Sequence, residues 1–163
     1  MTRRLLLTLA LAATPALFTT ACVAADTPGK AAAPAIEKAQ WPFTATEFAR
    51  FDQPWAMTFL PDGSLLVTEK QGTLKHFNLT TRKSAEIKGV PKVAYGGQGG
   101  LGDVLPHPQF AKNQFVYLSY AEEGDNDTRG AAVARARLVL AADGSGTLHD
   151  LKVIWRQTPK VEG

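Results

Sequence analysis

One order of strands and turns occurs twice in this chain of 163 residues, and it constrains the fold more than any single motif. In each copy an apolar run ends at a proline-containing turn, Pro61-Asp62-Gly63 in the first and Pro106-His107-Pro108 in the second. Further β-rich runs follow, separated by Gly, Asp and other turn residues. The expected strands are 55–60, 64–69, 73–79 and 84–90 in the first copy, and 101–105, 114–121, 131–140 and 148–156 in the second.

The repeat predicts an all-β fold of the β-propeller type. Aligning Pro61 with Pro108 gives an offset of 47 residues, within the range of about 40 to 50 residues for one four-stranded blade. The chain therefore has room for about two blades. A closed ring has about 4 to 8 blades, so two blades alone would leave apolar sheet faces and a strand edge uncovered. We expect this sequence to be the first part of a longer propeller.

Residues 1–25 have the pattern of an export signal. Arg3 and Arg4 precede an apolar run at 5–18, and small residues follow around Cys22. This run is shorter than the roughly 20 apolar residues that a membrane-spanning helix needs. Residues 26–47 contain few large apolar side chains, which predicts a flexible linker. The propeller part is then expected at 48–163, with ordered structure beginning near 41–48.

Two processing routes remain open for the signal. Residues 19–22 (TTAC) resemble a bacterial lipobox, in which Cys22 would be lipidated and anchor the protein to a membrane facing the periplasm. Residues 23–25 (VAA) are alternatively an acceptable signal-peptidase site, which would release a soluble periplasmic protein beginning at Asp26. Each route exports the chain.

Charge and cysteine content exclude several classes of function. The formal net charge is +3, and without Arg3 and Arg4 the remaining 16 Lys and Arg side chains face 15 Asp and Glu. Basic side chains form no stripe with interleaved aromatics, which argues against nucleic acid as a partner. The single cysteine excludes an internal disulfide framework and a Cys-based zinc site. Walker and dinucleotide-binding glycine motifs do not occur.

Several motifs in order carry a resemblance to a known family. They are 54–69 (PWAMTFLPDGSLLVTE), 97–104 (GQGGLGDV) and 107–110 (HPQF), followed by 116–121 (VYLSYA), 131–135 (AAVAR) and 154–160 (IWRQTPK). As an ordered set they resemble the N-terminal part of the quinoprotein sugar dehydrogenases, the soluble aldose, glucose and sorbosone dehydrogenases that depend on pyrroloquinoline quinone (PQQ). The resemblance covers residues 48–163.

The resemblance implies a six-bladed propeller that binds PQQ and calcium in its central mouth and oxidises an aldose at C1 to its lactone. In this chemistry a histidine base takes the hydroxyl proton, hydride passes to PQQ, and a further, unidentified acceptor removes the electrons. The family's base lies in a His-Phe-Gly motif shortly after the Pro-Lys pair, so we expect it beyond Gly163 together with the calcium ligands. No catalytic residue or metal ligand is then expected within the chain, and these residues alone are expected to be inactive.

Gln98 is the one residue onto which a site role of the family transfers. It matches the family's glutamine at the cofactor mouth, where an amide can bond a quinone or carboxylate oxygen and flanking glycines permit close approach. The alternative is a glycine-rich turn whose glutamine merely faces solvent. Gly102 departs from the larger apolar residue usual in the family and is expected to loosen its strand. Asp103 is expected to cap neighbouring backbone N–H groups.

The other polar candidates have structural explanations. His107 is expected to serve a turn, and solvated or edge positions suffice for His76 and His149. The loop 122–129 (EEGDNDTR) lacks the glycine and closing glutamate of an EF-hand, so a solvated hairpin is expected rather than a calcium site. Glu69 and Lys70 form either a pair at an active site or a surface pair at a turn. As an alternative to the enzyme, the scaffold could be a non-catalytic propeller that binds a partner or a glycan.

Overall fold

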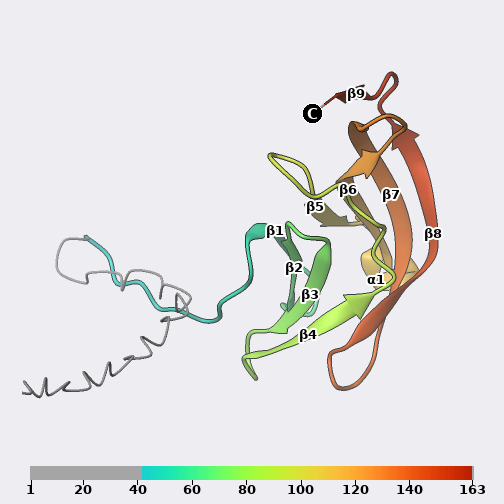
Figure 1. Ribbon diagram of the computed structural model, residues 1–163. Coiled ribbons are helices and arrows are strands. Elements are labelled where there is room, and N and C mark those ends of the chain that lie inside the picture. Colours follow the sequence, from blue (N-terminus) through green and yellow to red (C-terminus); the bar gives the residue numbers. More distant parts are fainter. Residues whose placement is uncertain (1–41, 163) are drawn as a thin grey trace, which may run out of the picture. The chain divides into compact units, whose positions relative to one another are not determined.

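The computed structural model describes residues 42–162 and shows a nine-stranded sheet, which consists of two four-stranded antiparallel sheets joined at one edge and one short additional strand (Figure 1). The first sheet consists of β1 (Pro54–Phe59), β2 (Leu65–Glu69), β3 (Thr73–Asn78) and β4 (Lys83–Lys88). The second consists of β5 (Leu101–Pro106), β6 (Phe115–Glu123), β7 (Thr128–Leu140) and β8 (Gly146–Arg156). In each sheet the strands pair in sequence order, as in a propeller blade. The predicted all-β fold with two four-stranded blades is confirmed.

The same aspartate turn closes a hairpin in both blades. The Asp62 carboxylate accepts hydrogen bonds from the Ser64 amide at 2.9 Å and from its hydroxyl at 2.6 Å. Asp143 accepts the equivalent pair from Ser145 at 2.9 and 2.7 Å. The intervening Gly63 has a φ of +82°, a backbone conformation that glycine adopts without a Cβ clash. These local bonds fix the register that the period-two pattern predicts.

The core lies between the two blades. One apolar cluster includes buried residues of both sheets, among them Leu66 and Leu74 from the first and Val104 and Leu118 from the second. Every second residue along this part of β7 faces the cluster, and three of them are alanines that are at most 1% exposed: Ala132, Ala134 and Ala136. Small side chains at these positions let the sheets approach closely. At the outer edge β4 and β8 also pair in parallel over two residues.

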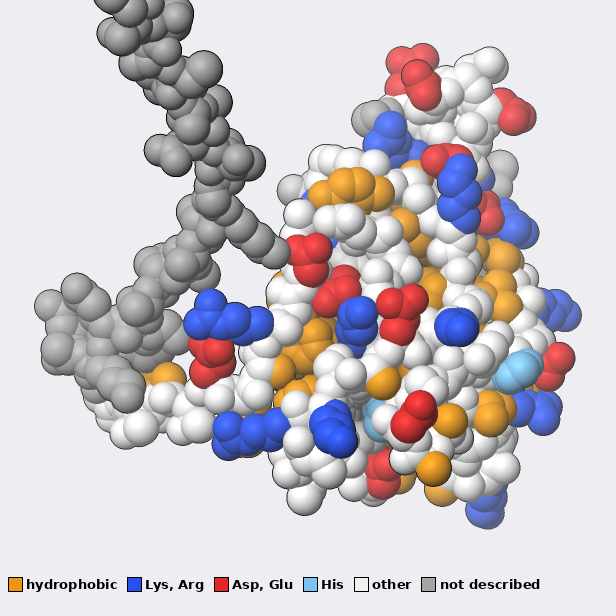
Figure 2. Space-filling model, turned by 60° about the horizontal axis from the view of Figure 1, so that its bottom comes forward, with side chains coloured by type: hydrophobic (Ala, Val, Ile, Leu, Met, Phe, Trp, Pro, Cys, Tyr) orange, Lys and Arg blue, Asp and Glu red, His pale blue; other side chains and the backbone are white. Residues whose placement is uncertain are grey.

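The opposite faces of the two blades remain partly uncovered. In the first blade Phe51 packs edge-on against Phe77 at 5.8 Å between ring centroids, whereas Met57 and Phe59 are 65% and 60% exposed. In the second blade the large apolar side chains that are exposed include Leu105, Val139 and Trp155. Figure 2 shows hydrophobic side chains at the surface of one face, interspersed with acidic and basic ones. Such faces are typical of blades that pack against further blades.

Three features differ from the sequence-based expectations. His76 is not solvated but 6% exposed, because its strand packs on both faces. Its Nδ1 donates to the Gly144 carbonyl at 2.9 Å, and its Nε2 has no hydrogen-bond partner among the described residues. A short helix, α1 (Phe110–Asn113), follows the Pro108 turn. A two-residue strand, β9 (Val161–Glu162), pairs with the beginning of β7.

Several assignments lie at or outside the described residues. The signal at 1–25, Cys22 and most of the linker fall in the part that the structure does not describe, so these remain predictions. Residues 42–53 contain no regular strand or helix, and β1 begins at Pro54. Within the described range, no helix is long and apolar enough to cross a membrane.

Candidate functional site

Four connections meet at one end of the two blades, toward the top of Figure 1. They are the β2–β3 turn, the long connection from β4 to β5 at 89–100, the β6–β7 loop at 124–127, and the segment after β8 that leads to β9. We call this end the mouth. Antiparallel pairing in sequence order places these connections there together, although they lie up to 90 residues apart in the chain. The mouth brings together the polar side chains described below.

Gln98 occupies the tip of a tight glycine turn at the mouth. Gly96 and Gly99 form a bridge across the turn, with the Gly99 amide donating to the Gly96 carbonyl at 2.6 Å. Gly97 has a φ of +51° and Gly100 a φ of +139°, and a Cβ on Gly100 would clash with the backbone carbonyl of Lys70. The Gln98 side chain is exposed and makes no hydrogen bond within the described part of the chain. Its amide is therefore available to a ligand.

Both blades hold this turn. The Lys70 ammonium donates to the Gly97 carbonyl and lies 5.6 Å from the ring centroid of Trp55 and 5.9 Å from that of Tyr95. The Lys70 carbonyl also accepts the Leu101 amide at 2.9 Å. On the side of the second blade, the Gly100 carbonyl accepts the amide of Ala121 at 2.9 Å. These anchors fix the base of the turn and leave its tip open, which suits a preorganised binding element.

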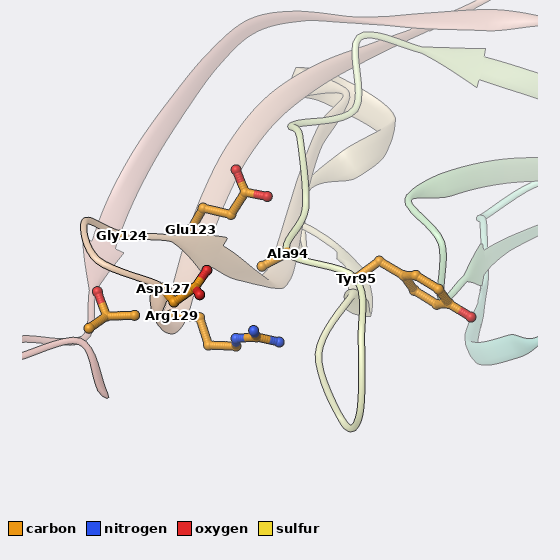
Figure 3. Close-up of a pocket in the computed structure, with 7 residues that line it drawn as sticks. Ala94, Tyr95, Glu123, Gly124, Asp127 and Arg129 are labelled. Atoms are coloured by element: carbon orange, nitrogen blue, oxygen red, sulfur yellow. The ribbon is translucent and has the colours of Figure 1, made fainter. Parts of the chain in front are cut away.

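A polar pocket of about 340 Å³ lies beside the turn (Figure 3). Its lining includes Tyr95, Glu123, Asp127 and Arg129. Arg129 is half-buried, and a Cβ on Gly96 would lie 3.5 Å from its Nη1 atom, so the guanidinium borders the Gln98 turn. The Glu123 carboxylate binds Lys92 at 2.6 Å instead of Arg129, its cross-strand neighbour. This bond to Lys92 lowers the pKa of Glu123.

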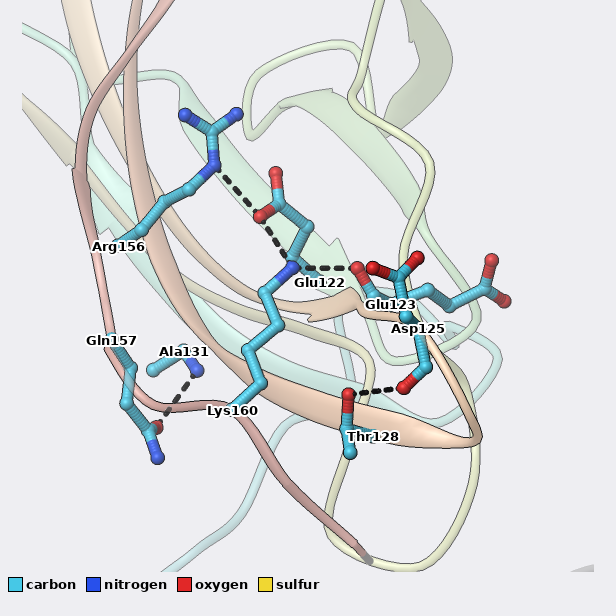
Figure 4. A network of polar contacts seen from close by, with 8 residues as sticks. All are labelled: Glu122, Glu123, Asp125, Thr128, Ala131, Arg156, Gln157 and Lys160. Carbon is cyan, nitrogen blue, oxygen red and sulfur yellow. Dashed lines mark hydrogen bonds and ion pairs between the residues drawn. The ribbon is translucent and has the colours of Figure 1, made fainter.

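The segment after β8 is fastened to the β6–β7 hairpin by one carboxylate (Figure 4). Glu122 Oε2 accepts from Arg156 Nε and from Lys160 Nζ, each at 2.8 Å. Lys160 Nζ also donates to the Glu123 carbonyl at 2.6 Å. The hydrogen bonds from Arg156 and Lys160 lower the pKa of Glu122 to about 2. This cluster, with the pairing of β9 to β7, holds residues 157–162 at the mouth.

The other sequence candidates have structural surroundings. Asp103 accepts the Val104 amide at 2.8 Å, which is the predicted capping role. His107 accepts the Gln109 amide at 2.9 Å in its turn, and exposed His149 lies on β8. Gly102 lies at a register shift in β5, where a Cβ would be 2.8 Å from the Ser119 hydroxyl. That hydroxyl bonds the next amide at 2.8 Å, so the strand is kept in place.

The two charged candidates at the end of β2 do not pair with each other. Glu69 is 7% exposed and accepts the Asp52 amide at 2.9 Å, whereas Lys70 turns to the mouth. The loop 122–129 forms the expected hairpin connection, with the Thr128 hydroxyl donating to the Asp125 carbonyl at 2.6 Å. Among residues 42–162, no group of three or more His, Cys, Asp or Glu is arranged to hold a metal ion.

Sequence reasoning missed Lys70 as a support of the turn, and it missed Arg129 and Asp127 as pocket residues. The contact between Lys70 and Gly97 spans 27 residues, and the bond between Lys160 and Glu122 spans 38. A local pattern carries no signal for contacts of this range. Only a two-blade arrangement, in which the polar residues at the strand ends meet at the mouth, would have indicated that these residues lie close together.

Comparison with known proteins identifies the family. The family model for glucose/sorbosone dehydrogenases matches residues 51–163. The chain belongs to this family. Aldose sugar dehydrogenase YliI of Escherichia coli is 41% identical over 113 residues, which are 69% of this chain and 30% of that protein.

Solved structures of the family share the fold. A glucose dehydrogenase matches with a TM-score of 0.62 and 44% identity over 68% of this chain and 31% of its own. The PQQ-bound form of an aldose sugar dehydrogenase from Streptomyces coelicolor matches with a TM-score of 0.57 and 24% identity, over 68% of this chain and 32% of its own. This chain therefore spans about a third of the length of its relatives.

Proposed function

We propose that this chain is the N-terminal part of an exported, PQQ-dependent aldose dehydrogenase that oxidises a sugar at C1 to its lactone. The proposal depends most on the Gln98 turn, which presents an unbonded amide at the mouth in a member of the sugar dehydrogenase family. Export rests on the signal pattern at 1–25, with Cys22 as the site of a lipid anchor if the lipobox is used. A small sugar and an electron acceptor are the expected partners.

The residues at the mouth fit part of a PQQ site. The Gln98 amide can donate to a quinone or carboxylate oxygen, and the glycines beside it let a planar ligand approach the backbone. Lys70 fixes the backbone of this turn, so on ligand binding only the Gln98 side chain has to be ordered. When bound, PQQ would supply the hydride acceptor. The chain's own contribution is to hold one edge of PQQ through Gln98 and to form the part of the mouth beside it.

The remaining parts of the site are proposed to lie after Gly163. The general-base histidine is expected in a His-Phe-Gly motif within about ten residues of the Pro159-Lys160 pair, on the basis of the family resemblance. The cluster of Glu122, Arg156 and Lys160 holds the chain that leads there. Calcium ligands and most of the groups that bind the PQQ carboxylates are proposed on later blades.

The first test is to read the coding DNA past Gly163 and express the resulting full-length protein. A His-Phe-Gly motif, four further blades and PQQ-dependent reduction of a dye with glucose or another aldose would support the enzyme. The purified apoprotein without added PQQ serves as the control. A stop codon directly after Gly163, or a complete ring without that histidine and without turnover, would favour the non-catalytic binding module instead.

A further inference from the structure

The pocket beside the Gln98 turn contains both donors and acceptors that form no hydrogen bond or ion pair with the described residues. The Arg129 guanidinium makes no hydrogen bond or ion pair with any described residue, although it is half-buried. The Asp127 carboxylate on the same wall also has no hydrogen bond or ion pair among these residues (Figure 3). A guanidinium offers only donors and a carboxylate only acceptors. A ligand that satisfies both must donate as well as accept.

The backbone that carries these two side chains is held in place. Arg129 lies near the start of β7, where it pairs with Glu123 on one side and with Val161 of β9 on the other. Asp127 has a φ of +58°, and the adjoining turn is closed by the Gly124 amide, which donates to the Thr128 carbonyl at 2.7 Å. The pocket wall is therefore already formed before a ligand arrives, which reduces the ordering cost of binding.

The charge balance favours a neutral ligand. Two carboxylates, those of Glu123 and Asp127, line the pocket with one guanidinium. Lys92 forms the ion pair with Glu123, and Arg129 adds a weaker coulombic attraction to the same carboxylate. With Lys92 counted, the two positive and two negative charges at the pocket balance. Because the charges of Asp127 and Arg129 oppose each other, the pocket offers neither an anion nor a cation a net electrostatic attraction. A neutral molecule with several hydroxyl groups needs no such attraction, because each hydroxyl both donates and accepts.

We propose that Arg129 and Asp127 form a sugar-hydroxyl subsite next to the Gln98 turn. This inference rests on the proposed function, since it assigns part of the substrate site to this chain. Vicinal hydroxyls of a pyranose would accept from the guanidinium and donate to the carboxylate. The hydroxyls belong either to the aldose that reacts or to the second unit of a disaccharide, and both sources present the same chemistry.

The test measures sugar binding to the full-length apoprotein by isothermal titration calorimetry, without PQQ, for Arg129→Gln and Asp127→Asn. Losing a hydrogen bond to a charged group weakens binding about 10- to 100-fold, so each variant should raise the dissociation constant at least tenfold. Asp125→Asn is the matched control, because Asp125 lies in the same loop but not in the pocket lining. Arg82→Gln, in the exposed β3–β4 turn, is the control for arginine.

Glucose and maltose distinguish the two sources of the hydroxyls. A loss for both sugars assigns the subsite to the reacting aldose, and a loss for maltose alone assigns it to the second unit. Binding of both sugars by Arg129→Gln and Asp127→Asn as tightly as by the unmodified protein would overturn the inference. PQQ binding, followed separately by fluorescence, tests the proposed function: its absence in the unmodified protein would refute that function while the sugar data still decide the subsite.

Discussion

Replacing Glu122 with glutamine should release the segment that runs from β8 to β9. Glu122 accepts from Arg156 and Lys160 at 2.8 Å each, and these bonds lower its pKa from 4.5 to about 2. This pKa shift means that the folded protein stabilises the ionised carboxylate over the protonated form by about 3 kcal/mol. The Arg156 side chain is 52% exposed, so solvent screens part of it and we expect about 1 to 2 kcal/mol.

Hydrogen exchange in the full-length protein measures this effect locally. A loss of 1 to 2 kcal/mol corresponds to about 5- to 30-fold faster exchange, and Glu122→Gln should show it in peptides covering 157–162 and 128–130. Glu123→Gln is the control: among the described residues its carboxylate forms an ion pair with Lys92 alone, and both side chains are more than half exposed. That variant should change exchange much less. Equal exchange in Glu122→Gln and the unmodified protein would refute the reasoning.

The same variant has a defined pH dependence. Because the folded pKa of Glu122 lies below its ordinary value, its contribution is complete above about pH 4.5 and is lost as the pH falls toward 2. The protection of residues 157–162 should therefore decline over that interval in the unmodified protein. Glu122→Gln should lack this part of the decline.

Three further predictions concern the turn, the faces and the leader. Gly100→Ala should lower the melting temperature of the full-length protein, because strain and a backbone clash at a φ of +139° cost about 1 to 3 kcal/mol. Gly97→Ala should lower it less, because a Cβ there would lie in open space. Equal melting temperatures for the two variants would contradict this. Residues 26–163 expressed alone should aggregate or fold partly, since each uncovered face of several hundred Å² withdraws on the order of 10 kcal/mol; a soluble monomer with a cooperative melt would refute this. Mass spectrometry of the mature N-terminus should find lipidated Cys22 if the lipobox is used, and an unmodified terminus at Asp26 would exclude the anchor.

Much of the fold could be predicted from the sequence because its signals are local. Turn residues such as Asp62-Gly63 and the alternation within strands identified all eight long strands to within a few residues. β9 could not be predicted, because two residues are too few to show the alternation of a strand. α1 could not be predicted either, because its four residues are too few to show a helical pattern. His76 was misplaced because alternation shows that a strand has two faces but does not show that both are packed.

The site could be predicted only in part. The family motif singled out Gln98, and the glycines around it explained why a turn would form there. The supports of that turn were invisible, because Lys70 reaches Gly97 only once two blades lie side by side. Arg129 and Asp127 had been read as members of a solvated loop, and the pocket they share with Tyr95 arises from the β4–β5 connection packing beside the β6–β7 hairpin.

The central claim is that the Gln98 turn is part of a PQQ site, and a cofactor titration tests it most directly. Adding PQQ to the full-length apoprotein with calcium should quench the protein's fluorescence. The Gln98→Ala variant should bind PQQ at least about tenfold more weakly, with an unchanged melting temperature. Removing the amide leaves its hydrogen-bond partner on PQQ unpaired, which costs about 1 to 3 kcal/mol. Gln109→Ala, between β5 and α1 and away from the mouth, is the control and should bind PQQ normally. Identical PQQ affinity for the Gln98 variant and the unmodified protein would contradict the account.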